Sequence, residues 1–336
     1  MSQQSIAPLS FSPYIRSVKR LVIIAFWGVG LTVTAQGQTD SLSAEITVVS
    51  KDYPGSDAPA CRAYYDVRDY NRGRKWLVGG TNAVLWGGST ILLNEIWYKD
   101  YPRSDFHTFN DAGNWRYMDK LGHAYTAYQL ANAEYAAWRW AGVRTKKATW
   151  LAGGISWGYL MTVEVLDGFS AEWGFSLADV TANTAGSGLF VAQQLVWGEQ
   201  RFQLKFGYKP SSYAALRPTI LGSAPSERLL KDYNAQSYWL AVSPGLFFKE
   251  SKFPKWIQVA VGYSVDKMLK GDADNYMIDG FTYRSESEFG LSLDIDWAQL
   301  PIKKPWLKKL VKPLNTLKIP FPAVFWWGGT CDVGIL

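Results

Sequence analysis

The sequence predicts an α+β protein in which a helical bundle of about four apolar helices is followed by an antiparallel β-sheet. Long apolar segments fill residues 74–199, and the pattern changes to strict alternation of apolar and polar residues after residue 199. Alternation of this kind also describes lipid-facing strands, so a partial membrane β-barrel is the alternative. Roughly five or six readable strands are fewer than the eight or so of the smallest membrane barrels, which favours the first architecture.

The amino terminus predicts export from the cytoplasm. Three basic residues, Arg16, Lys19 and Arg20, precede an apolar run over residues 21–33, and small residues follow. This is typical of a secretory signal peptide, here residues 1–35. An uncleaved membrane anchor is the alternative, although the run is short for crossing a bilayer. No cysteine directly follows the run, so we expect no lipid anchor and a location in the periplasm or outer membrane.

Composition excludes one class of partner and favours another. Removing residues 1–35 takes away three basic groups and no acidic ones, so the formal charge falls from +6 to +3. Such a charge does not predict nucleic-acid binding. The aromatic content of 15% against 19% charged residues is typical of membrane interfaces or large cores. Cys61 and Cys331 give no spacing signature, and their pairing stays open.

The helices are expected between residues 74 and 199, after a lead-in segment over residues 36–73. The first predicted helix contains four glycines, which lower helix propensity but allow a close neighbour, and we expect it to be buried. Glycine-containing loops separate the helices that follow. The expected helices are residues 75–97, 118–141, 148–166 and 177–197.

The strands are expected in residues 200–336. Alternation is clearest in residues 202–208, 257–265 and 289–297, each with one apolar face. Residues 238–248 form a fourth candidate that Pro244 interrupts. Residues 317–326 contain two prolines, which suits a strand at the edge of a sheet.

Polar residues recur three or four positions apart within the apolar segments between residues 119 and 186. On a helix, residues at this spacing share one face, so each pair should project together, while Lys120 would lie off that face. The pairs belong to separate helices, and we expect them to meet in one buried place. The pairs are Asp119 with His123, Glu164 with Asp167, and Asp179 with Asn183.

The chemistry of these residues has several interpretations. A histidine beside a carboxylate is oriented as a general base or metal ligand, so His123 is a candidate base that Asp119 orients. A satisfied buried network is the structural alternative, in which Asp167 opens a turn and Ser176 caps the helix that carries Asp179. A third alternative is a site for a polar headgroup or glycan. No metal signature is present, so neither metal nor cofactor is named.

Several segments together resemble a known family. They resemble the YfiM-type proteins of the periplasm or outer membrane, in the longer version found in Bacteroidetes (domain of unknown function 2279). More distantly, Asp-Lys-x-x-His, then Glu, then Asp-x-x-x-Asn-x-x-Gly over residues 119–186 resembles the VanZ-like membrane proteins linked to glycopeptide resistance. The resemblance implies an envelope location and no defined activity. The segments are residues 97–101, 106–111, 118–123, 164–174, 231–234 and 317–322.

The sequence therefore predicts an exported cell-envelope protein with a buried acid/His cluster and leaves its enzymatic activity open. One alternative is a metal- or His-dependent hydrolase or transferase that acts on an envelope lipid or glycan. Another is a structural component of an outer-membrane assembly. We expect association with a membrane and no nucleic-acid partner, while a protein partner and the oligomeric state are not encoded in any readable pattern.

Overall fold

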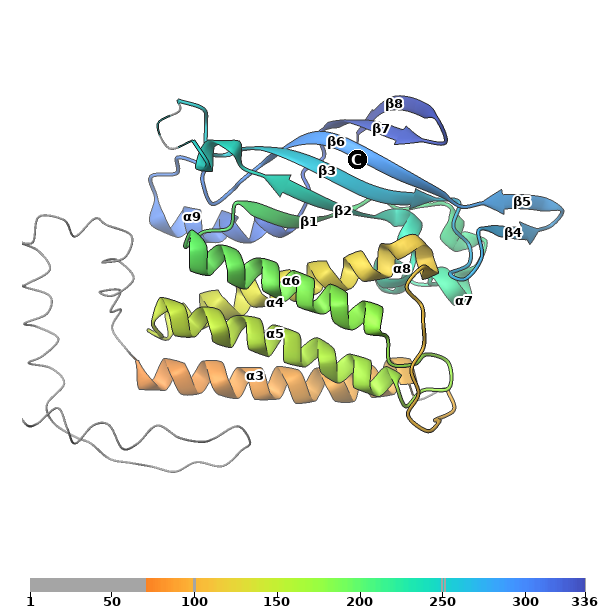
Figure 1. Cartoon of the computed structure of the whole chain (residues 1–336), viewed down its shortest axis with the longest axis horizontal. Coiled ribbons are helices and arrows are strands. Elements are labelled where there is room, and N and C mark those ends of the chain that lie inside the picture. Colours follow the sequence, from red (N-terminus) through yellow and green to blue (C-terminus); the bar gives the residue numbers. More distant parts are fainter. Residues whose placement is uncertain (1–70, 99–100, 249, 251, 336) are drawn as a thin grey trace, which may run out of the picture. The chain divides into compact units, whose positions relative to one another are not determined.

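A computed structural model describes residues 71–98, 101–248, 250 and 252–335 of the chain, all within the unit formed by residues 59–336. The predicted signal peptide, most of the predicted lead-in segment and Cys61 lie outside the described residues. The described residues confirm an α+β protein in which a helical bundle is followed by an antiparallel sheet (Figure 1).

The bundle is built around one central helix. Helix α4 packs against α5, against α6 and against one end of the sheet (Figure 1). Ser176 caps α6, because its hydroxyl accepts a hydrogen bond from the backbone N–H of Asp179 at 3.1 Å, as the sequence predicts. The helices are α3 (Arg72–Leu93), the π-helical turn η2 (Asn94–Tyr98), α4 (Met118–Trp140), α5 (Thr145–Asp167) and α6 (Leu177–Val196).

Helix α3 differs from its prediction, because most of its apolar side chains are exposed. Only Val78 is buried along this helix, whereas Trp76 and Val84 are 67% and 72% exposed. The helix contacts its neighbours along one narrow stripe, where Val78 joins a small apolar core and the Trp86 ring meets Tyr159 edge-on. The prediction of a buried helix is therefore wrong. None of the described helices combines the length and the apolarity that crossing a membrane requires.

The sheet has six antiparallel strands in the order β1-β2-β3-β6-β7-β8. A separate hairpin, β4–β5, leaves it between β3 and β6, and short helices fill the connections (Figure 1). The strands are β1 (Phe202–Tyr208), β2 (Gln236–Val242), β3 (Ile257–Asp266), β4 (Asn275–Ile278), β5 (Phe281–Arg284), β6 (Glu286–Ile295), β7 (Pro322–Trp327) and β8 (Thr330–Ile335). The short helices are η3 (Asn114–Tyr117), η4 (Tyr213–Ala215), α7 (Pro218–Leu221), α8 (Pro225–Lys231), η5 (Tyr233–Ala235), η6 (Pro244–Leu246), α9 (Pro305–Val311) and η7 (Lys312–Thr316).

The prolines act differently from their predictions. Strand β2 ends before Pro244, which starts the short helix η6. Strand β7 is not an edge strand, because β6 and β8 flank it. Pro320 precedes β7, and Pro322 is its first residue, ahead of the Ala323 at which pairing with β6 begins. Neither proline therefore interrupts that ladder. Strand β8 and the β4–β5 hairpin have no counterpart among the expected strands.

One face of the sheet is buried although it carries polar side chains. Lys205 on β1 and Asp294 on β6 form an ion pair of 3.3 Å, and both side chains are fully buried. These strands are separated by β2 and β3, so a flat sheet would hold them about 14 Å apart. Their contact shows that the sheet curls around this face. Gly262 and Gly290 leave the space that the Trp239 ring fills.

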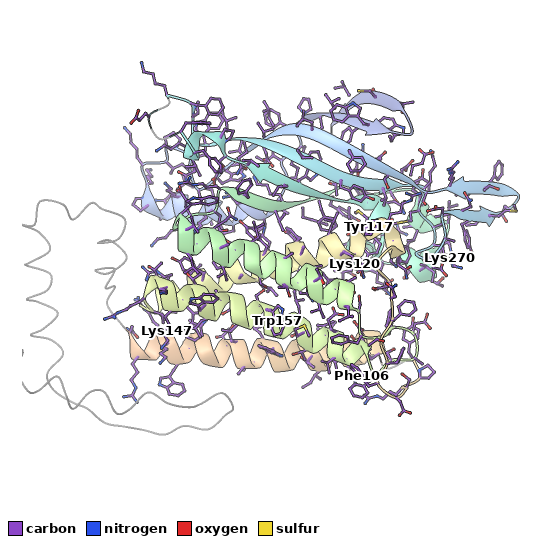
Figure 2. All side chains as sticks on the ribbon, viewed as in Figure 1. Phe106, Tyr117, Lys120, Lys147, Trp157 and Lys270 are labelled. Carbon is purple, nitrogen blue, oxygen red and sulfur yellow. The ribbon has the colours of Figure 1, made fainter. Side chains whose placement is uncertain are left out.

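The opposite face meets the bundle mainly at β1 and β2, and Met118 at the start of α4 also shares a buried core with Val265 of β3. Tyr125 of α4 packs against Phe206 and Tyr238, and the Gln129 amide donates a hydrogen bond of 2.6 Å to the Leu204 carbonyl. Residues 101–117 join η2 to α4 through an irregular segment. Phe106 of this segment packs against Phe169 and Phe175 beside the carboxyl end of α5 (Figure 2). The segment thereby brings Asp111 to the first turn of α4.

Candidate functional site

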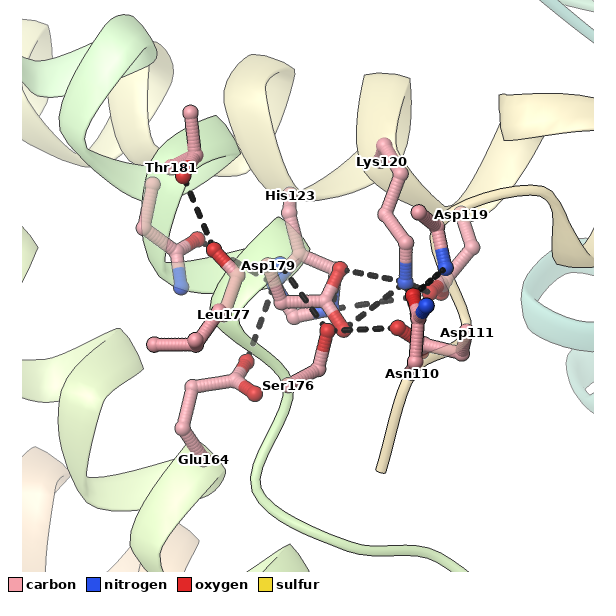
Figure 3. Close-up of polar contacts among 12 residues, drawn as sticks. Asn110, Asp111, Asp119, Lys120, His123, Glu164, Ser176, Leu177, Asp179 and Thr181 are labelled. Carbon is pink, nitrogen blue, oxygen red and sulfur yellow. Dashed lines mark hydrogen bonds and ion pairs between the residues drawn. The ribbon is translucent and has the colours of Figure 1, made fainter. Parts of the chain in front are cut away.

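Four parts of the chain contribute to one polar cluster. Helix α4 supplies Asp119, Lys120 and His123, α5 supplies Glu164, α6 supplies Asp179 and Asn183, and the segment before α4 supplies Asp111 (Figure 3). These side chains point toward one another between the helices. Helical spacing correctly predicts the faces of α4 and α6.

Lys120 lies at the centre of the carboxylates. Its Nζ is 2.6 Å from Asp111 Oδ2, 2.9 Å from Asp119 Oδ2 and 2.8 Å from Asp179 Oδ1 (Figure 3). The expectation that Lys120 lies off the shared face is wrong. A lysine side chain is long and flexible, so the ammonium reaches acids that approach α4 from other segments.

Acceptor oxygens surround both ring nitrogens of His123. Nδ1 is 3.1 Å from Asn183 Oδ1 and 3.4 Å from Glu164 Oε1. Nε2 is 3.9 Å from Asp119 Oδ1 and 3.7 Å from Asp179 Oδ1. An imidazolium has a donor at each nitrogen, so this environment favours the protonated ring.

Two predicted residues sit differently from the rest. Asp167 accepts a hydrogen bond of 2.6 Å from the Tyr98 hydroxyl, so its described contact is with η2 and not with His123. Asn183 is completely buried, and its Nδ2 has no hydrogen-bond partner among the described residues. A buried amide in this state is expected to meet water or a bound polar group. All predicted residues except Asp167 meet at His123.

Sequence spacing misses three further members of the cluster. Asp111 accepts a hydrogen bond from the Ser176 hydroxyl, and Tyr233 donates one of 2.9 Å to Asp119 Oδ1. Lys120 is the third. Asp111 and Tyr233 come from irregular segments, where no periodicity gives the direction of a side chain. The only sequence signal for them was their place in the segments 106–111 and 231–234 of the family resemblance.

Burial and mutual charge determine the protonation of the cluster. Burial raises the pKa of Glu164 to about 8 and that of Asp167 to about 7. Burial and the nearby Asp119 raise the pKa of Asp179 to about 6. For His123, burial works against the charged ring, but Asp119, Asp179 and Glu164 outweigh it and the pKa rises. For Asp119, His123 and Lys120 outweigh burial and the pKa falls. The cluster therefore favours the carboxylate form of Asp119, the imidazolium form of His123 and the protonated form of Glu164.

A pocket reaches the cluster from the seam between the bundle and the sheet. Its volume is about 370 Å³, and Asp119 and His123 are its charged lining residues. Glu164 and Asp179 are buried beside them. Apolar and aromatic side chains make most of the remaining wall, among them Tyr125, Leu160, Phe206, Leu229, Leu230 and Tyr238. The pocket thus combines the polar side chains of Asp119 and His123 with an apolar wall, which suits an amphiphilic ligand.

Three residues of the cluster have the geometry of metal ligands. One ligand atom from each of Asp119, His123 and Asp179 lies within 4.8 Å of the others. Carboxylate and imidazole ligands suit several divalent ions. However, the Lys120 ammonium already forms ion pairs with both carboxylates, Asp119 and Asp179. A divalent ion would have to displace it or tolerate its charge.

We expect the substitution Lys120→Met to create affinity for divalent cations. Removing a positive charge this close to the ligand oxygens takes away a repulsion of about 1 to 4 kcal/mol, so affinity should rise at least about fivefold. Isothermal titration with Mn²⁺ and Zn²⁺ measures the change, and the Tm of the variant should increase when the ion is added. Equal affinities in the variant and the wild type would contradict this role of Lys120.

Comparison with known proteins supports the location. Residues 107–194 match the model of a family described as "Predicted periplasmic lipoprotein (DUF2279)". No curated protein and no solved structure is significantly similar to the chain. The matched region is about a quarter of the chain and contains Asp111, the three α4 residues of the cluster, and the cluster residues of α5 and α6. The family description agrees with the periplasmic or outer-membrane location that the sequence predicts.

Proposed function

We propose that the chain is an envelope enzyme that hydrolyses or transfers the headgroup of an amphiphile by acid–base catalysis at Asp119 and His123. The observation that carries this proposal is the pocket, in which a charged Asp/His pair lies at the end of an apolar wall. A lipid offers both a polar headgroup and an acyl chain, and it is abundant in the envelope. The proposal takes up the hydrolase or transferase alternative from the sequence with one change. His123 acts as the acid and Asp119 as the base, whereas the sequence predicts His123 as the base that Asp119 orients.

The ionisation of the pair suits hydrolysis of an ester. The Asp119 carboxylate accepts a proton from a water molecule as its oxygen attacks the phosphorus or carbonyl carbon of the headgroup ester. The His123 imidazolium donates a proton to the leaving oxygen as the ester bond breaks. The proton then returns from Asp119 to His123, whose Nε2 lies 3.9 Å away, so one water is consumed and the pair is restored. In a transfer reaction, an alcohol replaces the water.

The surrounding residues hold this pair in position. Asn183 accepts from His123 Nδ1–H and fixes the ring, and Tyr233 donates to Asp119 Oδ1 and fixes the carboxylate. Lys120 balances the excess of acids and lowers the pKa of Asp119 together with His123. On this proposal, Bacteroidetes YfiM-type proteins and, over residues 119–186, VanZ-like proteins share the Asp-Lys-x-x-His site. Association with a membrane follows from the same proposal, because the substrate resides there.

Replacing His123 tests the proposal directly. The purified protein is incubated with short-chain phosphatidylglycerol and phosphatidylethanolamine, and released headgroups are measured by mass spectrometry. We expect turnover by the wild type and a loss of about 100-fold or more in kcat for His123→Gln, because a general acid contributes about this much. Pocket binding, followed by NMR with a non-hydrolysable ether analogue, should change little.

The other histidine provides a matched control. His107 hydrogen-bonds the Trp173 carbonyl from the segment before α4, outside the cluster. His107→Gln should therefore leave kcat unchanged. Full turnover by His123→Gln, combined with a lowered Tm, would contradict catalysis and identify the cluster as a structural network. Absence of headgroup release by the wild type from these lipids would also count against the proposed reaction.

A further inference from the structure

In the part of the sheet that the bundle leaves uncovered, the face with polar side chains is buried and the apolar face is exposed. In water, a half-covered antiparallel sheet normally buries its apolar face and exposes its polar one. Here the buried face contains the Lys205–Asp294 ion pair and the buried amide of Gln258 beside a small apolar core formed by Trp239 and three alanines. The other face of the same strands is apolar. Polar residues inside and apolar residues outside are the arrangement of strands that contact lipid.

The exposed apolar residues form continuous rows across the strands. Direct partners in the ladders place Val261, Leu291, Val324 and Val333 in one row over β3, β6, β7 and β8. The members of the face are 43% to 68% exposed. We define the apolar sheet face as Val261, Phe289, Leu291, Leu293, Trp326 and Val333.

An aromatic row borders the aliphatic one. Phe206, Tyr238, Tyr263, Phe289 and Trp326 are successive partners from β1 to β7. Aromatic side chains gather at the depth where acyl chains meet headgroups. A row of aromatics beside a row of aliphatics therefore matches the boundary of a lipid layer. A contact with a second protein chain would not require this layering.

Positive charge lies at the β1 end of the same row. Leu317 forms an isolated parallel β-bridge with Phe206 of this row. Leu317 directly follows η7, the short helix after α9. Helix α9 exposes Trp306 and Leu310, and lysines surround these apolar side chains. Basic segments with exposed tryptophan and leucine bind anionic lipid surfaces. The lysines are Lys303, Lys304, Lys308, Lys309 and Lys312.

We propose that the apolar sheet face rests on the lipid of an anionic membrane, with the α9 lysines against its headgroups. This surface goes beyond the proposed reaction, since it assigns the contact with the membrane irrespective of what the pocket does. The orientation also has a consequence for the pocket. Phe206 and Tyr238 belong both to the aromatic row and to the pocket wall, so the row runs from the lipid contact into the pocket.

Cys331 allows a local test of this contact. It is free and exposed, and it lies directly opposite Trp326 on the same face. The full chain with Cys61→Ser is labelled at Cys331 with an environment-sensitive fluorophore and mixed with vesicles of phosphatidylethanolamine containing 30% phosphatidylglycerol. We expect a blue shift and protection from iodide quenching. Because the probe reports only its own surroundings, an interaction elsewhere in the chain does not produce this result.

Charged variants separate the possible occupants. Val261→Glu combined with Leu291→Glu should abolish the blue shift, whereas Leu177→Glu, at an even more exposed leucine on α6, should retain it. Lys308→Glu with Lys309→Glu should raise the lipid concentration at half-maximal shift at least about fivefold. No shift with vesicles, or an undiminished shift in the Val261/Leu291 variant, would overturn the proposal. A shift without vesicles that grows with protein concentration would instead identify a second copy of the chain as the occupant.

Discussion

Replacing Gly186 by alanine is expected to destabilise the protein by about 3 kcal/mol or more. A Cβ at this position would overlap the backbone carbonyl of Ala124 and lie 2.9 Å from the Cβ of Ala127. Backbone atoms cannot rotate away, so α4 and α6 would have to separate along their whole contact. Asn183 lies three residues before Gly186 on α6, and the separation would also move it from His123. Chemical denaturation measures the loss.

A glycine two residues further along α6 is the control. Gly188 is exposed, and a Cβ there would meet no atom within 4 Å. Alanine at this position should stabilise the protein by up to about 1 kcal/mol, because alanine has the higher helix propensity. Equal effects of the two substitutions would contradict a close approach of α4 and α6 at Gly186.

The free energy of unfolding is expected to fall as the pH rises from about 5 to 8, because Glu164, Asp167 and Asp179 all have raised pKa values, that of Glu164 being the highest. Burial raises the pKa of the folded Glu164 carboxyl to about 8, whereas an unfolded glutamate has a pKa near its ordinary value of 4.5. Between these values the folded state holds the proton more tightly, so its stability is complete below the lower pKa and lost as the pH passes the upper one. The raised pKa of His123 acts in the same direction.

Glu164→Gln tests the contribution of this one group. Glutamine keeps the shape of the protonated acid and cannot ionise, so the part of the decrease that Glu164 contributes should disappear, while the parts from Asp167, Asp179 and His123 stay. About 1.4 kcal/mol per pH unit sets an upper limit near 5 kcal/mol, and we expect on the order of 3 kcal/mol between pH 5 and pH 8, because the titration of Glu164 is only about half complete at pH 8. Urea denaturation at pH 5 and pH 8 measures the difference between variant and wild type. An unchanged slope in the variant would contradict the assignment.

An exposed glutamate, Glu227, provides the control variant for this pH dependence. Glu227 lies on the surface near the start of α8, where it accepts hydrogen bonds from the Ser223 hydroxyl and backbone. Its pKa is lowered by these bonds, so its contribution is lost only as the pH falls through the acid range. Glu227→Gln should therefore leave the slope between pH 5 and 8 intact.

Much of the cluster is predictable because helical spacing is a local property. Asp119 and His123 share a face of α4, and Asp179 and Asn183 share a face of α6, whatever surrounds them. The same logic fails for Asp167, whose hydroxyl partner Tyr98 comes from a distant turn of the chain. It also fails for Lys120, since a flexible side chain follows the charges that reach it and not the spacing within its helix.

The sheet shows a similar division. Alternation correctly locates β1, β3 and β6, because a period of two is set by the strand itself. The alternation does not show which of the two faces of the sheet the rest of the protein covers. The position of the bundle over β1 and β2 and the curl that joins Lys205 to Asp294 decide this, and they leave the apolar side exposed.

By itself, the sequence determined the order of helices and strands, the signature of an exported chain, and the residue types available for chemistry. These properties depend on neighbours along the chain, through hydrogen-bonding periods and side-chain preferences. Only the tertiary structure decided that Lys120 lies among three carboxylates, that Tyr233 holds Asp119, and that a pocket opens beside His123. These properties depend on segments up to about a hundred residues apart, whose meeting is governed by packing and burial and leaves no local pattern.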